Sequence, residues 1–300
     1  MSRIEINLIG GLSASVGDAP AHPLKLSPTG LSLFGLLAMG AGKRALRCEA
    51  VTETLWPECA PAKQRARLRT ALWRLKKGLP DWAQGMVCRE GDTSGLSLPD
   101  NVHLVHEGFE RCVVRLCAIS VDVMTDEDFT ALDVCLRRYG GPLLDGVQGD
   151  WIMADREKFA EIYCQGLAHQ INYLRTHGRD HETIRAGRRL LQVDPYREDV
   201  HATLIETYAG SGRPERAKRQ FQTCEDLFQG ELGISPVVAR LSLSKTQGAG
   251  EVPREDIVQM VEDLQGSVAA MVVQLERIQA VLGDGRGGVQ PVKRDVSMSA

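Results

Sequence analysis

The densest group of residues that could do chemistry in this 300-residue chain is the basic segment QRARLRTALWRLKK, at residues 64–77. Together with Lys63 it holds seven lysines and arginines and no acidic residue, although the formal net charge of the whole chain is −3. Ammonium and guanidinium groups neutralise phosphates, and each neutralised phosphate releases condensed counterions. The segment therefore predicts a polyanion as its partner.

We expect the basic segment to be a helix that begins near Pro61 and ends at Gly78. Four leucines recur at helical spacing and would form its buried stripe: Leu68, Leu72, Leu75 and Leu79. Eight other side chains are candidates for contacts with DNA: Lys63, Arg65, Arg67, Arg69, Thr70, Trp73, Arg74 and Lys77. The alternative is an ordinary solvated helix face. The lack of acids for i, i+4 pairs favours nucleic acid.

The elements that must position this helix precede and follow it in the sequence. Residues 3–9 and 12–16 alternate apolar and polar around Gly10-Gly11, which predicts two strands of a small N-terminal sheet. Ser27-Pro28-Thr29 opens a first helix that continues through 31–39, and CEAVTETL at 48–55 predicts a second helix. The basic helix is thus the third of three.

A β-hairpin is predicted after the basic helix, from the segments 86–90 and 95–99 with a turn at 91–94. Three helices followed by a hairpin is the order of a winged helix-turn-helix, whose recognition helix enters the major groove while the wing reaches the neighbouring groove. Arg89, Thr93 and Ser94 are therefore the candidate wing contacts.

From about residue 120 onward, helical patterns dominate the sequence. A shift of 34 residues superimposes Ile171 on Ile205 and Leu174 on Tyr208, and it also superimposes Gly178-Arg179 on Gly212-Arg213. A period of 34 is that of tetratricopeptide helix pairs. Tyrosines in these helices could line a ligand groove, but filling of the core is the favoured role.

The C-terminal part contains a heptad pattern of apolar residues after a linker at 244–254 rich in Ser, Gly and Thr. The pattern predicts a coiled-coil-like helix at 255–283 that joins protomers into a homo-oligomer. Its seam would be formed by eight residues: Ile257, Val261, Leu264, Val268, Met271, Leu275, Ile278 and Leu282. The alternative is packing of this helix onto its own chain. Residues 284–300 are expected to be disordered.

Several function classes find no support in the sequence. The eight cysteines show no CxxC pair or metal-ligand spacing, so we expect reduced thiols and no metal, with a disulfide framework as the alternative. We find no catalytic motif and expect neither an enzyme nor a cofactor. No apolar run reaches the length of a membrane span, and no signal peptide is recognised, which favours a cytoplasmic protein.

Much of the chain between residues 3 and 243 resembles the Streptomyces antibiotic regulatory protein type of transcriptional activator. The matching phrases are LSPTG (26–30), LRCEAVTETLWPECAPAKQRARLRTALWRLKKGL (46–79), YGGPLLDG (139–146), DWIMADREKF (150–159), GRRLLQVDPYREDVHATLIETYAGSGRPERAKRQF (187–221) and ELGISP (231–236). The resemblance implies an OmpR-like winged helix joined to an all-helical bacterial transcriptional activator domain with tetratricopeptide-like repeats. It also implies binding to promoter DNA and recruitment of RNA polymerase.

By position, the resemblance makes the loop 56–62, with Trp56 and Glu58, the surface that faces the polymerase, and Lys63–Lys77 the recognition helix. The wing departs from the family pattern, because the stretch SGLSL carries neither the usual aromatic nor the usual basic residue.

These observations predict a mainly α protein with an α+β N-terminal part. We expect a winged helix DNA-binding domain at 1–100 and an all-α activator domain at 101–243. The predicted function is sequence-specific transcription regulation, with double-stranded promoter DNA and RNA polymerase as partners. The alternative is a helical-repeat scaffold that binds a protein partner without DNA.

Overall fold

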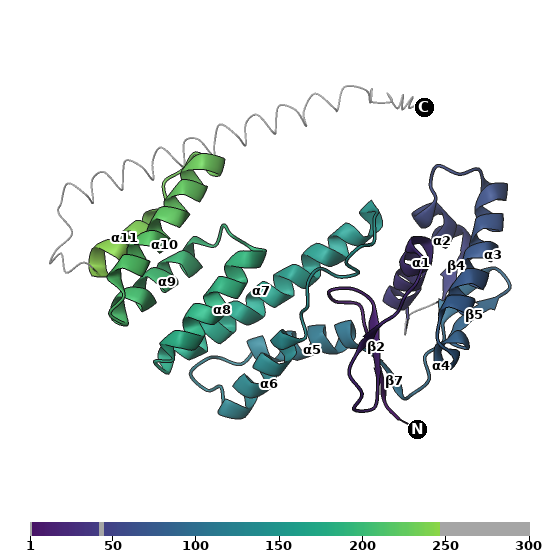
Figure 1. Cartoon of the computed structure of the whole chain (residues 1–300), viewed down its shortest axis with the longest axis horizontal. Coiled ribbons are helices and arrows are strands. Elements are labelled where there is room, and N and C mark those ends of the chain that lie inside the picture. The colour runs from purple at the N-terminus through teal and green to yellow at the C-terminus, as the bar shows by residue number, and fades with distance from the viewer. Residues whose placement is uncertain (1, 42–44, 247–300) are drawn as a thin grey trace, which may run out of the picture. The chain divides into compact units, whose positions relative to one another are not determined.

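The computed structural model describes residues 2–41 and 45–246, which form eleven α-helices and seven short strands (Figure 1). The chain divides into two compact units, Met1–Asp194 and Pro195–Ala300. This division falls inside the range 101–243 that the sequence analysis assigned to one domain, so the boundaries of the domains stay a prediction. The helix predicted at 255–283, with its eight seam residues, lies outside the described residues.

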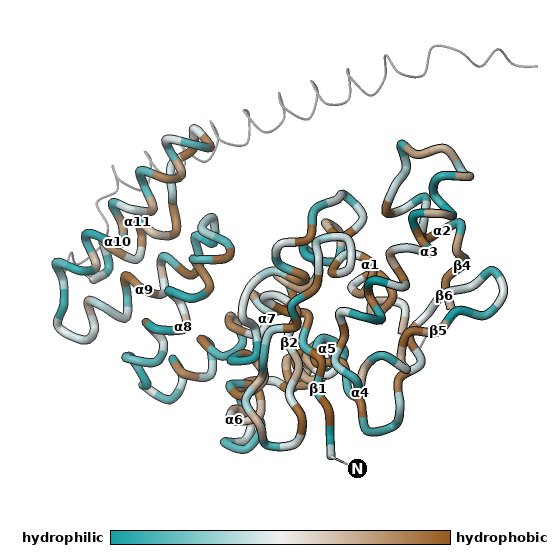
Figure 2. The backbone as a smooth tube through the Cα atoms, turned by 45° about the vertical axis from the view of Figure 1, so that its right-hand side comes forward, coloured by the Kyte–Doolittle hydropathy of each residue, from teal (hydrophilic) through white to brown (hydrophobic). Residues whose placement is uncertain are grey.

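A four-stranded sheet forms at the N-terminus, in the order β3-β2-β1-β7. Its strands are β1 (Ile4–Asn7), β2 (Ser13–Val16), β3 (His22–Pro23) and β7 (Val102–Leu104). β1 pairs antiparallel with β2 and parallel with β7, where Ile4 lies opposite Val102. Figure 2 shows hydrophobic, brown backbone along β1, which belongs to the core through the buried Ile4 and Ile6. The first two strands confirm the prediction from alternation.

Three helices follow in the chain: α1 (Pro28–Met39), α2 (Cys48–Leu55) and α3 (Pro61–Gly78). Ser27 caps α1, since its hydroxyl accepts a hydrogen bond from the backbone N–H of Gly30 at 3.2 Å. Proline occupies the first position of α1 and of α3, where its missing N–H has no helical partner to lose. All three helices confirm the sequence prediction.

The hairpin forms the larger part of a second sheet with the order β4-β6-β5. Its strands are β4 (Leu46–Arg47), β5 (Val87–Glu90) and β6 (Thr93–Leu96), and the short helix α4 (Asp81–Gln84) precedes it. Only Gly91 and Asp92 form the turn, with Gly91 at φ 56°. The predicted four-residue turn was therefore too long. Thr93 and Ser94 belong to β6, because a two-residue turn suits the twist of paired strands.

The first unit continues with four α-helices and one 3₁₀ turn. They are α5 (Val105–Cys117), α6 (Asp126–Arg137), η1 (Asp150–Ile152), α7 (Met153–Thr176) and α8 (Asp180–Val193). The loop between α6 and η1 folds back onto the N-terminal sheet. The N–H of Leu144 in this loop donates to the carbonyl of Leu8 at 2.7 Å. Arg156 of α7 donates to the carbonyls of Leu143, Leu144 and Val147 in the same loop.

The second unit contains α9 (Glu198–Gly210), α10 (Pro214–Leu227), the π-helical turn η2 (Phe228–Leu232) and α11 (Val237–Thr246). α10 and α11 both pack on α9. α11 runs three residues into the range 244–254 that was predicted to be linker, so the linker prediction began too early.

The 34-residue repeat is confirmed by the turns that follow α7 and α9. Gly178 and Gly212 have φ values of 64° and 73°, in the left-handed region that glycine adopts without a steric penalty. After each glycine, a backbone N–H bonds back five residues, from Arg179 to Leu174 at 2.9 Å and from Arg213 to Tyr208 at 2.8 Å. This is the Schellman geometry of a helix end. The two helix pairs, α7–α8 and α9–α10, thus have the same turn.

One prediction about the cysteines is wrong. Cys112 on α5 and Cys135 on α6 form a disulfide, whereas reduced thiols were expected throughout. The two helices pack against each other and bring together sulfur atoms that are 23 residues apart in the chain. The other six cysteines form no disulfide.

Candidate nucleic-acid interface

Helix α3 separates its apolar and its charged residues onto different faces. The buried residues are Gln64, Leu68, Ala71, Leu72 and Leu75, and Leu79 beyond the helix end is also buried. α3 packs against α1 and α2 through this face. All eight residues predicted to contact DNA are exposed: Lys63, Arg65, Arg67, Arg69, Thr70, Trp73, Arg74 and Lys77. The structure thus places these residues together on the solvent side of one helix.

The basic side chains of α3 are not neutralised by the part of the chain that the structure describes. The ion pairs within 4 Å in the described part of the chain include no residue of α3. The guanidinium of Arg67 donates to the sulfur of Cys59 at 2.8 Å, and the ammonium of Lys77 lies 4.8 Å from the centre of the Trp73 ring. Neither contact removes positive charge from the face. Trp73 itself is 58% exposed, which is unusual for so large an apolar ring.

The loop between α2 and α3 is tied to α3 by two side chains. The buried Gln64 donates from its amide to the carbonyl of Trp56 at 2.8 Å, and Arg67 reaches Cys59 as described above. Trp56 is partly exposed, and Glu58 is exposed. The loop therefore presents an acidic and an aromatic side chain in a position fixed relative to α3.

A hollow of about 460 Å³ lies where the start of α1 meets α3. Its lining includes the hydroxyl-bearing residues Ser27, Thr29 and Thr70 and the guanidinium-bearing residues Arg67 and Arg74. Hydroxyl and guanidinium groups are the common donors to phosphate oxygens. Thr70, Arg67 and Arg74 were predicted from the sequence, whereas Ser27 and Thr29 were not, although the Ser-Pro helix start marks the end of α1 that faces α3.

The hairpin offers less positive charge than α3. Arg89 is exposed, but the neighbouring Glu90 and Asp92 are exposed as well. Thr93 is half-buried, and its hydroxyl donates to the carbonyl of Glu90 at 2.9 Å. Ser94 is only 1% exposed, and its oxygen lies 3.2 Å from the sulfur of Cys48. The side chain of Ser94 is thus turned into the core, and Arg89 and Thr93 are the wing candidates with exposed surface.

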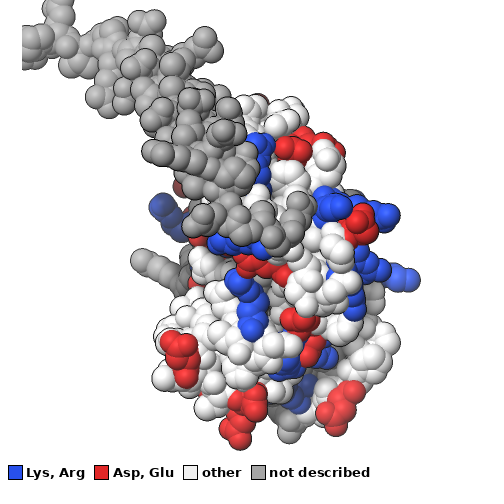
Figure 3. Space-filling view, turned by 90° about the vertical axis from the view of Figure 1, so that its left-hand side faces the viewer, with Lys and Arg blue, Asp and Glu red and all other residues white. Residues whose placement is uncertain are grey.

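Elsewhere the charges are mixed. On the face that Figure 3 shows, basic and acidic side chains lie interspersed among uncharged residues. Within residues 2–41 and 45–246, no group of three His, Cys, Asp or Glu residues could hold a metal ion. No helix in the same ranges combines the length and the apolarity that crossing a bilayer requires.

Comparisons with known proteins connect the helical part to transcription. Residues 109–245 match the family model of the bacterial transcriptional activator domain, a range that begins within α5 and ends in α11. The fold is similar to that of Mycobacterium tuberculosis EmbR, solved in complex with a low-affinity phosphopeptide. The TM-score is 0.64 at 19% sequence identity, over 92% of this chain and 72% of that chain. No curated protein matches the sequence. The helical part is thus of a class found in transcriptional activators.

Proposed function

We propose that this protein is a sequence-specific DNA-binding transcription regulator that acts as an activator. One observation carries the proposal: the basic residues of α3 are exposed on one face, without ion pairs to the described part of the chain, while its leucines hold the helix on α1 and α2. Like charges on one face repel each other, and binding of a polyanion relieves this repulsion and releases counterions. The match of residues 109–245 to an activator domain supports the same function.

In the proposed complex, α1–α3 and the hairpin β5–β6 act as a winged helix-turn-helix, with α3 as the recognition helix in the major groove. Guanidinium groups such as that of Arg74 can pair with guanine edges or hold phosphates. The hollow beside Ser27 and Thr29 would receive a backbone phosphate that Arg67 also contacts. Among the wing residues, Arg89 remains a candidate contact.

We further propose that the loop with Trp56 and Glu58 contacts RNA polymerase. The support is geometric, because Gln64 fixes the loop to α3 and would thereby fix it relative to bound DNA. Glu58→Ala should lower transcription from the bound promoter without weakening DNA binding, since loss of a carboxylate removes no contact to phosphate. Equal transcription by wild type and variant would contradict this role.

Binding to duplex DNA tests the proposal. The full-length protein should retard a random-sequence duplex at low salt, and selection from a random pool should enrich one sequence motif. The logarithm of the binding constant should fall linearly with the logarithm of the salt concentration, by a slope of about 0.9 for each neutralised phosphate. Absence of retardation at low salt would exclude DNA binding and favour the alternative of a helical-repeat scaffold that binds an acidic protein surface.

The predicted homo-oligomer remains part of the proposal. Its seam residues lie outside the described residues, so the test is a comparison of masses in solution. Light scattering should give a multiple of the chain mass for the full-length protein and a single chain mass for a variant that ends at Gly250. Equal masses would contradict oligomerisation through 255–283.

A further inference from the structure

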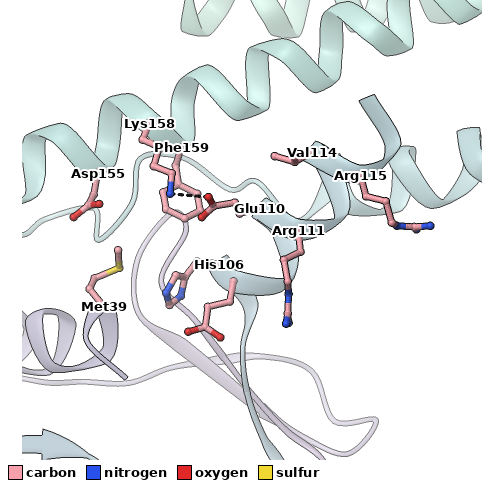
Figure 4. A pocket seen from close by; sticks show the side chains of 10 residues that line it. Met39, His106, Glu110, Arg111, Val114, Arg115, Asp155, Lys158 and Phe159 are labelled. Atoms are coloured by element: carbon pink, nitrogen blue, oxygen red, sulfur yellow. Dashed lines mark ion pairs between the residues drawn. The ribbon is translucent and has the colours of Figure 1, made fainter. Parts of the chain in front are cut away.

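A second cavity of the first unit lies between α5 and α7, and the last residue of α1 also lines it (Figure 4). Its volume is about 520 Å³. Ligand-binding pockets commonly measure about 300–1,000 Å³. The cavity is therefore large enough for a small organic molecule.

Apolar groups form much of the wall of this cavity. Met39 comes from α1, Val114 from α5 and Phe159 from α7. Val114 is 54% exposed, while Val113 and Leu116 of the same helix face the core and are buried. His106 is buried at the same wall, with its ring 6.0 Å from that of Phe159 in an edge-on arrangement. An apolar ring system would cover the exposed surface of Val114 and gain from its burial.

The charged groups around the cavity are distributed unevenly between its two sides. Lys158 neutralises Glu110, since the two are joined by an ion pair of 2.6 Å. Arg111 and Arg115 lie one helical turn apart on α5, and no carboxylate of the described chain lies within ion-pairing distance of either. In Figure 4, Asp155 lies on one side of the cavity and both arginines lie on the other, where the Arg111 and Arg115 side chains point in different directions. The arginine side can therefore accept an anionic group.

We propose that this cavity binds a small organic anion with an apolar ring system. The ring system covers Met39, Val114 and Phe159, and the anionic group, a carboxylate, sulfonate or phosphate, meets the guanidinium group of Arg111. Guanidinium groups are well suited to these anions because they donate two parallel hydrogen bonds. The site is independent of DNA binding, but it includes the end of α1, and α1 supports α3.

The probe that tests the site is 8-anilinonaphthalene-1-sulfonate, whose aromatic rings and sulfonate match the proposed chemistry. Titration of the full-length protein, without DNA, should give a saturable rise of fluorescence with one site per chain. Val114→Asp should remove this binding by placing a negative charge at the ring position. Arg111→Ala should weaken it about three- to tenfold through loss of a charge-assisted contact. Glu107→Gln should strengthen it, because Glu107 lines the cavity and repels an anion.

Matched controls separate this site from general dye binding. Val134→Asp changes a valine that is 51% exposed on α6, three residues before its helix end as Val114 is on α5, and should leave binding unchanged. Arg216→Ala removes an exposed helical arginine on α10 and should also have no effect. Near-ultraviolet circular dichroism reports whether each variant is folded.

Two outcomes would overturn the proposal. If Val114→Asp and Val134→Asp bind the dye as wild type does, the dye does not occupy this cavity. If the uncharged N-phenyl-1-naphthylamine binds as tightly as the sulfonate and Arg111→Ala changes neither affinity, the cavity does not select anions. Weaker binding of the uncharged dye, unaffected by Arg111→Ala, would support the proposal.

Discussion

Gly35 in α1 lies so close to Leu144 that a Cβ atom at position 35 would be 2.4 Å from Cδ1 of the leucine. Leu144 has little room to move away. It is fully buried, its φ of 49° is in the left-handed region, its N–H donates to Leu8, and its carbonyl accepts from Arg156 at 2.7 Å. The absence of a side chain at Gly35 therefore lets the 140–147 loop pack against α1.

Gly35→Ala should destabilise the protein, although alanine is the better helix former. The added methyl group must displace Leu144 in a close-packed region, at a cost of about 1–3 kcal/mol. The control is Gly108→Ala in α5, where an added Cβ meets no atom within 4 Å. It should stabilise by about 0.5–1 kcal/mol through helix propensity alone. Urea unfolding of both variants measures the difference, and a gain of stability in both would contradict the packing argument.

Arg74→Ala should weaken binding to the selected DNA sequence by about 1–3 kcal/mol if the side chain reads a base. If it holds a phosphate instead, the loss should be smaller, and the salt slope should fall by about 0.9. Fluorescence anisotropy across salt concentrations measures both quantities. Arg216→Ala on α10 serves as the control and should change neither. An Arg74→Ala protein that binds as wild type does, with the same slope, would contradict the docking of α3.

The disulfide should make stability depend on redox conditions. Cys112→Ser should lower the free energy of unfolding by about 3 kcal/mol without reductant, as the closure of a loop of this length predicts. The difference should disappear with dithiothreitol. Cys117→Ser on the same helix should leave the response to dithiothreitol intact, since Cys117 forms no disulfide. Titration of the denatured, unreduced protein should find six thiols, and finding eight would show that the bond is absent.

His201 should cause the free energy of unfolding to decrease in mild acid. Burial lowers the pKa of His201 from its ordinary value of 6.5. In the neutral ring both nitrogens are used, because Nε2 lies 3.0 Å from the carbonyl of Pro195, and Nδ1 accepts from the amide of Gln220 at 2.8 Å. A proton on Nδ1 would break the second bond. The folded state therefore resists protonation, and the unfolded state does not.

Below pH 6.5 the unfolded chain takes up a proton that the folded chain excludes, so the free energy of unfolding should decrease as the pH falls through this value. The slope from one such group is at most about 1.4 kcal/mol per pH unit. Burial also lowers the pKa of His169, which adds to the slope. Urea unfolding between pH 7.5 and 5.5, for wild type and His201→Gln, measures the share of His201. Equal slopes would contradict this account.

The elements that the sequence predicted correctly are those whose signals are local. Ser27 and Pro28 mark the start of α1, and the glycines at 178 and 212 mark the repeat turns, because each of these residues suits a backbone geometry by itself. The two faces of α3 followed from its leucine spacing. These signals were enough to select the exposed residues of the candidate DNA-binding surface.

The features that were missed depend on contacts between distant segments. β4 and β7 are two and three residues long, so they have no periodicity, and they form only because β6 and β1 provide partners. Ser94 was predicted to lie in the turn of the hairpin. The turn is two residues shorter than predicted, so Ser94 belongs to β6. The disulfide required the packing of α5 on α6. Helix α5 itself was missed, although Val105, Phe109, Val113 and Leu116 have helical spacing.

The pairing of β7 with β1 matters for anyone who wishes to study the DNA-binding part alone. A fragment that stops at Asp100 would lack β7 and would leave the hydrogen-bonding groups of β1 open along one edge, and such edges promote aggregation. Leu8 and Gly10 would also lose their backbone bonds to residues 142–144. A soluble truncation should therefore extend at least through Arg156, whose side chain holds that loop in place.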